Sequence, residues 1–459
     1  MSTMMFRVTA CLVGRHFAAA ALAGAMLCSA PLASAQTAGE VEFARGVGFA
    51  QTAGQTPRTL GKGLALKEGD RLTTADGASA IIKLEDGTRM TVRPNSELLI
   101  QQYKFKENAV DNSMVMQLLR GGFRAITGLI AKSSPNAARV NTKTATIGIR
   151  GTDFDARLCT TECKAESAQV QEKPRPNAVQ ASAKLVTVQG DISAVDKAGA
   201  RRRVVGGGSV YPGETLETGA DARAVLAFRD DSRLTVGART RFRVDSFVFD
   251  EAKPAEGRFL VSLLRGSMRA LTGLIAKANN RNVGFSTATA TIGIRGTGLD
   301  MDCSDEVKDD GCNIFTWLGS IEVTQNGQAS GQVLQAGQGL FVSRTEVRPL
   351  SSPILENLPR PDGVPVDTRQ LFSGGELDAG QEGLFVFVRD GHIEVTTPTE
   401  TLHLGKGETG FAADNGSTVR PRLTPLFIEH DRQPMPDSKN PLLLSVMGDV
   451  GVRAAEQCK

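Results

Sequence analysis

The chain contains an internal duplication. Residues Thr144–Thr152 read TATIGIRGT, and Thr289–Thr297 repeat the same nine residues. Upstream of these stretches, Leu118–Lys132 and Leu263–Lys277 are identical at twelve of fifteen positions. The interval between the copies is the size of a domain, whereas a solenoid repeat has roughly 20 to 50 residues. The duplication therefore predicts one kind of domain that is present twice.

The first 35 residues have the pattern of a secretory signal. Arg7 and Arg15 precede an apolar, alanine-rich stretch, and Ala33-Ser34-Ala35 is the small-x-small pattern that signal peptidase cuts. We expect cleavage before Gln36. No later segment approaches the roughly 20 apolar residues that a membrane-spanning helix needs. The sequence predicts a periplasmic or extracellular protein whose mature chain has no membrane span.

Composition disfavours a nucleic-acid partner and does not favour a carbohydrate-binding module. The formal net charge of +3 is close to balance, which does not indicate a nucleic-acid partner. Aromatic residues make up 5% of the chain, with a single tryptophan, Trp317, so few flat rings are present to bind a sugar.

The periodicity of apolar residues is that of strands. Ala78–Leu84 and Thr88–Val92 flank Asp86-Gly87, a hairpin turn signal. The second copy has the same arrangement at Ala222–Phe228 and Arg233–Val236. We expect a mainly β protein made of tandem β-sandwich or jelly-roll-like domains with little helix.

Two segments divide the chain. Lys164–Ala183 is polar and lacks aromatic residues, and Arg348–Gly375 carries five prolines, which deny regular hydrogen bonding. Beyond them, Val388–Phe411 echoes Thr316–Phe341 of the second copy. The expected division is a signal peptide (1–35), a first copy (36–163), a linker (164–184), a second copy (185–347), a proline-rich linker (348–375) and a partial C-terminal β module (376–459).

The order of the motifs resembles the FecR-domain family of exported bacterial proteins. Each copy runs from a Gly-Asp-x-Leu-x-Thr-like element through a hairpin to Ala-Thr-Ile-Gly-Ile-Arg-Gly-Thr, over about 41–158 and 185–342. The resemblance implies a periplasmic β-rich domain, which in that family senses the occupancy of an outer-membrane transporter for a sigma factor. This sequence lacks the internal membrane helix and the cytoplasmic segment of such regulators, so the resemblance carries over binding or scaffolding rather than the anti-sigma role.

The duplicated polar residues of the Ile-Arg-Gly-Thr motif are the candidate binding residues: Arg150, Thr152, Arg295 and Thr297. An arginine fork can clamp an anion through two hydrogen bonds. The alternative, which we favour, is structural: each arginine pairs with a domain acid such as Asp155 or Asp300, five residues on, and Gly151 or Gly296 shapes a bend or bulge.

Catalysis is not indicated. Neither copy contains a histidine to act as a base, and no Gly-x-Ser-x-Gly, His-Glu-x-x-His or phosphate-loop motif occurs. His392 and His403 fall in the proposed C-terminal hairpin, with Glu394 and Glu408 as the obvious additional ligands, but a metal site needs at least three well-placed ligands. We expect ordinary surface histidines, no metal, no cofactor and no enzyme activity.

Cysteine positions fit an oxidising compartment. The pairs Cys159–Cys163 and Cys303–Cys312 each follow the Ile-Arg-Gly-Thr motif of their copy, so we expect one disulfide in each copy. A zinc site with four thiolates would require the copies to meet. Cys458 remains as a free or intermolecular thiol.

These features predict a non-catalytic binding or scaffold protein of the cell envelope, whose partner is an envelope protein or a cell-wall component. The alternative is an extracytoplasmic sensory component that relays a signal through a separate membrane regulator.

Overall fold

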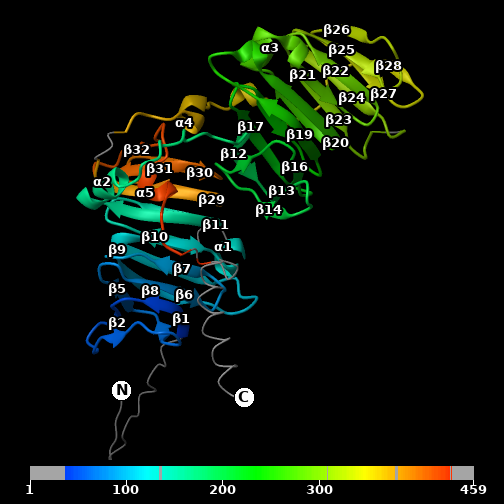
Figure 1. Cartoon of the computed structure of the whole chain (residues 1–459). Coiled ribbons are helices and arrows are strands. Elements are labelled where there is room, and N and C mark those ends of the chain that lie inside the picture. Colours follow the sequence, from blue (N-terminus) through cyan, green and yellow to red (C-terminus); the bar gives the residue numbers. More distant parts are fainter. Residues whose placement is uncertain (1–36, 134–136, 308, 378–380, 435, 437–459) are drawn as a thin grey trace, which may run out of the picture. The chain divides into compact units, whose positions relative to one another are not determined.

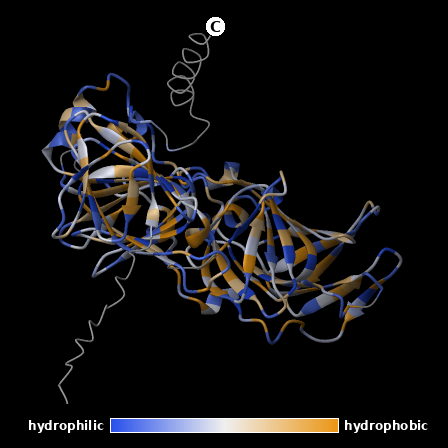
Figure 2. Cartoon of the chain, turned by 90° about the horizontal axis from the view of Figure 1, so that it is seen from below, coloured by the Kyte–Doolittle hydropathy of each residue, from blue (hydrophilic) through white to orange (hydrophobic). Residues whose placement is uncertain are grey.

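The computed structural model describes residues 37–133, 137–307, 309–377, 381–434 and 436 (Figure 1). The expected signal peptide and Cys458 lie outside these residues. The described chain is mainly β with short helices, as the sequence predicts, and its strands form two large sheets. Figure 2 shows hydrophilic and hydrophobic residues alternating along the strands. Among the described residues, no helix has the length and apolar character needed to cross a membrane.

The first sheet contains strands from both ends of the described chain. The N-terminal strands are β1 (Thr37–Arg45), β2 (Gly48–Thr52), β3 (Arg58–Thr59), β4 (Ala65–Lys67), β5 (Asp70–Thr74), β6 (Ser79–Leu84), β7 (Arg89–Val92), β8 (Glu97–Lys104), β9 (Ser113–Ile126), β10 (Ala138–Asn141) and β11 (Thr146–Cys159). Helix α1 (Leu129–Ser133) follows β9, and α2 (Thr161–Ala168) follows β11. The C-terminal strands are β29 (Gly383–Thr396), β30 (Thr401–Gly405), β31 (Thr409–Ala413) and β32 (Thr418–Val419), followed by α5 (Leu426–Glu429).

The second sheet is made by the second copy alone. Its strands are β12 (Ala183–Gln189), β13 (Ile192–Val195), β14 (Arg201–Arg203), β15 (Ser209–Val210), β16 (Thr215–Thr218), β17 (Arg223–Phe228), β18 (Arg233–Val236), β19 (Arg241–Val248), β20 (Arg258–Leu271), β21 (Val283–Ser286), β22 (Ala290–Ile294), β23 (Gly298–Cys303), β24 (Cys312–Leu318), β25 (Ser320–Gln325), β26 (Gln332–Gln335), β27 (Gln338–Val342) and β28 (Val347–Leu350). Helices α3 (Leu274–Ala278) and α4 (Thr368–Phe372) complete the described helices, apart from three-residue turns.

The long strand β20 belongs to two groups of paired strands in the second copy, one with β16 and β19 and one with β17, β18 and β23. Its first part pairs with β19, and from Gly266 onward it pairs with β23. Gly266 has φ 87°, and a Cβ there would come within 2.5 Å of the Thr240 backbone, so the crossover needs glycine. Side chains of both groups, such as Leu216 of β16 and Leu226 of β17, pack in one core.

The C-terminal strands complete the first copy. Strand β29 pairs antiparallel with β11 from Thr146↔Thr396 to Cys159↔Gly383 (Figure 1). Leu384, Val386 and Ile393 lie in the same hydrophobic core as residues of β1–β11. In the second copy, the corresponding partners β24 and β25 follow β23 directly in the sequence.

In its described part, the C-terminal region does not form a separate sheet, although the sequence predicts a module of its own there. The region expected as a partial module, 376–459, shares a sheet and a core with 36–163 over its described part. We therefore propose that the first FecR-like domain is discontinuous and that the second copy is inserted between its two parts. The linker from Lys164 also contacts this body, since buried Asn177 donates to the carbonyls of Thr409 and Pro421.

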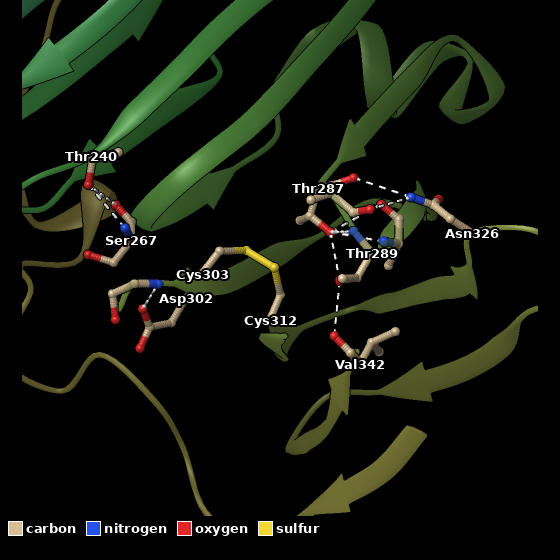
Figure 3. The surroundings of a disulfide bond; sticks show 12 residues. Thr240, Ser267, Thr287, Thr289, Asp302, Cys303, Cys312, Asn326 and Val342 are labelled. Carbon is tan, nitrogen blue, oxygen red and sulfur yellow. Dashed lines mark hydrogen bonds between the residues drawn. A yellow bond between two sulfur atoms is a disulfide. The ribbon is translucent and has the colours of Figure 1, made fainter. Parts of the chain in front are cut away.

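Each copy contains one disulfide. Cys159 at the end of β11 is bonded to Cys163 in α2, and Cys303 of β23 is bonded to Cys312 of β24. Figure 3 shows the second bond together with nearby threonine hydrogen bonds, in which Thr289 donates to the carbonyl of Val342 across the sheet. The cysteines of the described residues thus bond within their own copies.

Candidate functional site

The Ile-Arg-Gly-Thr motif lies at a bulge within β11 in the first copy and at a bend between β22 and β23 in the second. Gly151 and Gly296 have φ values of 63° and 81°, which favour glycine. The hydroxyl of Thr152 donates to the carbonyl of His392 at 2.8 Å, and that of Thr297 donates to the carbonyl of Ser320 at 2.8 Å. Both threonines are buried and join neighbouring strands. Their contacts are those of structural residues.

The two motif arginines form ion pairs with glutamates on the neighbouring strand. Arg150 Nη2 lies 2.9 Å from Glu394 Oε2, and Arg295 Nη2 lies 3.3 Å from Glu322 Oε2. The side chain of Arg150 is 18% exposed and that of Arg295 is 54% exposed. The motif of the second copy therefore presents its arginine to solvent, whereas the first copy largely covers it.

Both arginines thus pair with an acid, as expected, but the expected partners Asp155 and Asp300 are wrong. A strand rises about 3.3 Å per residue, so an acid five residues along the same strand is far away, whereas cross-strand neighbours are about 5 Å apart. Asp155 lies directly opposite Arg124, and Asp300 directly opposite Arg269. The acids pair with these arginines instead.

A buried Arg–Asp pair is thus repeated in both copies. Arg124 Nε lies 2.7 Å from Asp155 Oδ1, and Arg269 Nε lies 3.0 Å from Asp300 Oδ1. The next strand supplies a third member: Arg389 Nε donates to Asp155 at 2.7 Å, and Trp317 Nε1 donates to Asp300 at 3.0 Å. The echo between the C-terminal hairpin and the second copy aligns Arg389 with Trp317, and this was the sequence signal for the third member.

Burial shapes the electrostatics of the pair. Desolvation raises the pKa of Asp300 to about 6, although the Arg269 and Trp317 donors favour its ionised form. In the first copy, desolvation lowers the pKa of Arg124 while Asp155 opposes that shift. Such a pair is stable only if the remaining guanidinium N–H groups find acceptors.

Main-chain carbonyls supply these acceptors in the second copy. Arg269 Nη1 donates to the carbonyls of Leu355 at 3.0 Å and Leu358 at 2.7 Å. Arg233 donates to the carbonyls of Val364 at 2.9 Å and Val366 at 3.3 Å. We call residues 355–366 the second capping segment.

The first copy has an equivalent segment. Arg124 donates to the carbonyls of Asp431 at 3.1 Å and Gln433 at 3.0 Å, and Thr91 donates to that of Pro434 at 2.8 Å. We call residues 431–434 the first capping segment. It is more firmly held, because the nearly buried carboxylate of Asp431 also pairs with Arg93 and Arg124. Both copies therefore use the same face to hold main chain that lies outside the sheets; in the second copy this main chain includes the 3₁₀ turn Pro361–Gly363.

A groove lies beside the motif of the second copy. Its volume is about 790 Å³, and its lining includes Gly296, Thr297, Lys277, Leu318 and Val366. Leu318 is 49% exposed, so the groove offers apolar surface next to charged side chains of both signs: Arg233, Lys277 and Arg369 with Asp231 and Asp367. Thr297 is the candidate residue of the sequence analysis that lines it.

The paired histidines are not ordinary surface residues, which corrects the sequence-based expectation. His392 is 5% exposed, and its ring stacks on that of His403 with centroids 5.5 Å apart. Desolvation lowers the pKa of His392 and lowers that of His403 to about 4. No group of three or more potential metal ligands occurs within the described part of the chain.

The fold and these sites define a β-rich, disulfide-containing protein with a duplicated domain. The family model described as "FecR protein" matches residues 70–172 and 214–322. The chain therefore contains two FecR-type regions in tandem.

Two solved structures of a candidate anti-sigma factor from Parabacteroides distasonis are similar to part of the chain, at 15% sequence identity and a TM-score of 0.24. The match covers 30% of this chain and 59% of that protein. The comparison with curated proteins gave no match.

Proposed function

We propose that this protein is a non-catalytic binding or scaffold protein of the cell envelope. The observation that carries the proposal is the repeated Arg–Asp face, which in both copies holds a segment of main chain through carbonyl hydrogen bonds. Such contacts recognise a polypeptide without transforming it. The disulfides favour an oxidising location outside the cytoplasm.

The partner surface that we favour is the groove of the second copy, next to the exposed Arg295. The corresponding arginine of the first copy is covered by its pairing with β29. An envelope protein or a cell-wall component would contact Leu318 and the charged side chains there. We propose Arg295 as the binding residue of this surface and a structural role for Arg150, Thr152 and Thr297.

A second candidate follows from the two FecR regions. Members of that family carry periplasmic sensing domains, so the protein could instead be a sensory component that relays a signal through a separate membrane regulator. The identity of the partner separates the two functions.

Photo-crosslinking in intact cells tests the proposal. A photoreactive phenylalanine analogue at Leu318 should give a discrete adduct with an envelope protein or cell-wall fragment. The same analogue at Val110, which is 95% exposed and lies away from the groove lining, is the control. Mass spectrometry of the adduct then distinguishes a structural partner from a membrane regulator. Equal labelling at both positions would contradict a specific surface at the groove.

A further inference from the structure

The second capping segment is held in an unusual way for part of a folded chain. Of residues 355–366, only Pro361 is buried, and the others are half-buried or exposed. Its contacts with the second copy are mainly carbonyl hydrogen bonds to arginines and the stacking of Arg360 over Trp317, 4.1 Å from the ring centre. Because little apolar surface is buried, this segment belongs to the least stable part of the structure.

The surface beneath the second capping segment is formed by buried side chains of central strands. Asp300 is 1% exposed and Arg269 is 9% exposed, and both lie on central strands of the second copy. Asp300 Oδ2 is buried and accepts no hydrogen bond within the described residues. The face thus offers guanidinium donors for two carbonyls, one spare acceptor for an N–H group, and an indole ring for a cation.

The chemistry of the occupant follows from these groups. The capping segment carries Pro359, Pro361 and Pro365, which have no N–H group to donate to a strand ladder and therefore keep the segment from pairing as a strand. Arg360, between Pro359 and Pro361, provides the cation that stacks on the indole ring of Trp317. The occupant is therefore a proline-bearing peptide with a basic side chain, which pairs with no strand and makes at most a single 3₁₀ turn.

We propose that the face formed by Arg269, Asp300 and Trp317 is a docking site for a proline-bearing peptide of a partner protein, and that the second capping segment occupies it when the partner is absent. This inference rests on the proposed binding function and names the class of partner. The first copy lacks the indole ring and holds its segment through buried ion pairs, so its face is structural.

Trp317 makes the exchange directly measurable, because it is the only tryptophan of the chain. In a full-length variant, residues 353–365 are replaced by an equally long Gly/Ser sequence. Its indole emission should shift to the red, since the ring loses its cover. A synthetic peptide with the sequence of residues 352–367 should reverse the shift, and its Kd for the replaced chain should be at least tenfold lower than for the unaltered chain.

Matched arginine variants locate the peptide. In the replaced chain, Arg269→Lys keeps the charge and loses the fork, so peptide affinity should fall at least tenfold. The equivalent change in the first copy, Arg124→Lys, should leave the affinity within twofold. Circular dichroism confirms that each variant is folded. If the replaced chain does not fold, Arg360→Ala in the unaltered chain provides the same test, because it removes the stacking cation and should raise the affinity for added peptide severalfold.

The peptide site is overturned if the folded replaced chain does not bind the peptide, or if Arg269→Lys and Arg124→Lys have equal effects. A scrambled peptide that binds as well as the ordered one would have the same consequence. A specific adduct at Leu318 combined with failed peptide binding would leave the scaffold function standing and remove only this site.

Discussion

At the scale of single residues, the main lesson is which neighbour an ionisable side chain meets in a sheet. The sequence shows duplicated arginines and acids, but distance along the chain is a poor guide to their pairing. Arg269 and Asp300 are directly opposite each other on β20 and β23, whereas Arg295 contacts a glutamate of β25. Register decides these contacts, and register depends on the whole sheet.

The two arginines of the second copy should therefore differ in their effect on stability. Replacing Arg269 by alanine leaves the buried Asp300 without its countercharge, which typically costs about 3–5 kcal/mol. Replacing Arg295 by alanine removes a mostly exposed pair, which is worth about 0–1 kcal/mol. Denaturant unfolding of the full chain measures both changes. Equal losses of stability would refute the assignment of Arg269 as the buried partner.

The stacked histidines predict a pH dependence. Their folded-state pKa values lie below the ordinary value of 6.5, so the unfolded chain binds protons first as the pH falls. The stability should be fully present above pH 6.5 and should be lost as the pH falls towards about 4, the folded-state value of His403. The charged groups whose fields act on the pair are Lys184, Arg150, Arg202, Arg420 and Glu394.

The loss of stability should reach about 3 kcal/mol for His403, since each pKa unit is worth about 1.4 kcal/mol. The variant His392→Phe tests this origin, because neither ring nitrogen of His392 makes a hydrogen bond in the described structure. Its stability should change less steeply between pH 6.5 and about 4 than that of the unaltered chain. His430→Gln, which removes a histidine that pairs with Glu172 instead, is the control. An unchanged slope in His392→Phe would show that carboxylates cause the acid sensitivity.

At the scale of elements, β29 is the strand that joins the C-terminal part of the chain to the first copy. It covers the edge of β11 along nearly its whole length and adds buried side chains to the first core. In the second copy, β24 and β25 do the same for β23 and β22 without leaving the copy. The two copies thus have equivalent sheets that are completed from different places in the sequence.

Removal of residues 376–459 should unfold the first copy and spare the second. The deletion takes Leu384, Val386, Val388, Ile393 and Val395 out of the first core. Each such side chain contributes about 1.5–3 kcal/mol, so their sum approaches the whole stability of a typical domain, about 5–15 kcal/mol. The second core contains no residue beyond 342 among its buried members. Hydrogen exchange should show protection in the second copy alone, and equal protection in both copies would contradict the shared core.

Strand content and the duplication could be predicted from the sequence because both are local properties. The alternation around Asp86-Gly87 reappears as the hairpin of β6 and β7, and its repeat as that of β17 and β18. The partner of β11 could not be predicted in this way, because more than 200 residues separate Cys159 from Gly383. The hydrogen bonds from Arg124 to the carbonyls of Asp431 and Gln433 could not be predicted either. They also join residues far apart in the sequence, and backbone carbonyls leave no side-chain pattern.

At the scale of the whole molecule, the proposed insertion of the second copy predicts that the first domain can fold without it. The two copies also contact each other. Lys184 of β12 is fully buried, and its Nζ lies 3.1 Å from Oε2 of Glu408. Tyr211 accepts a hydrogen bond from the backbone N–H of Lys406. Neither contact belongs to the hydrophobic core of the first copy, whose buried members all come from residues 38–156 and 384–412.

Excision of residues 183–350, with a Gly/Ser connection of about ten residues, should therefore leave a folded first domain. Glu408 keeps Arg420, whose Nε lies 3.1 Å away, and gains water in place of Lys184, so no charge is left buried without a partner. We expect a strand-type circular dichroism spectrum, an intact Cys159–Cys163 disulfide and one cooperative transition. The excised segment, produced separately, should also unfold cooperatively, because its core is continuous in sequence. An aggregated product from the first chain alone would show that the first copy needs the insert to fold, and the discontinuous domain would then have to be replaced by a single core that spans both copies.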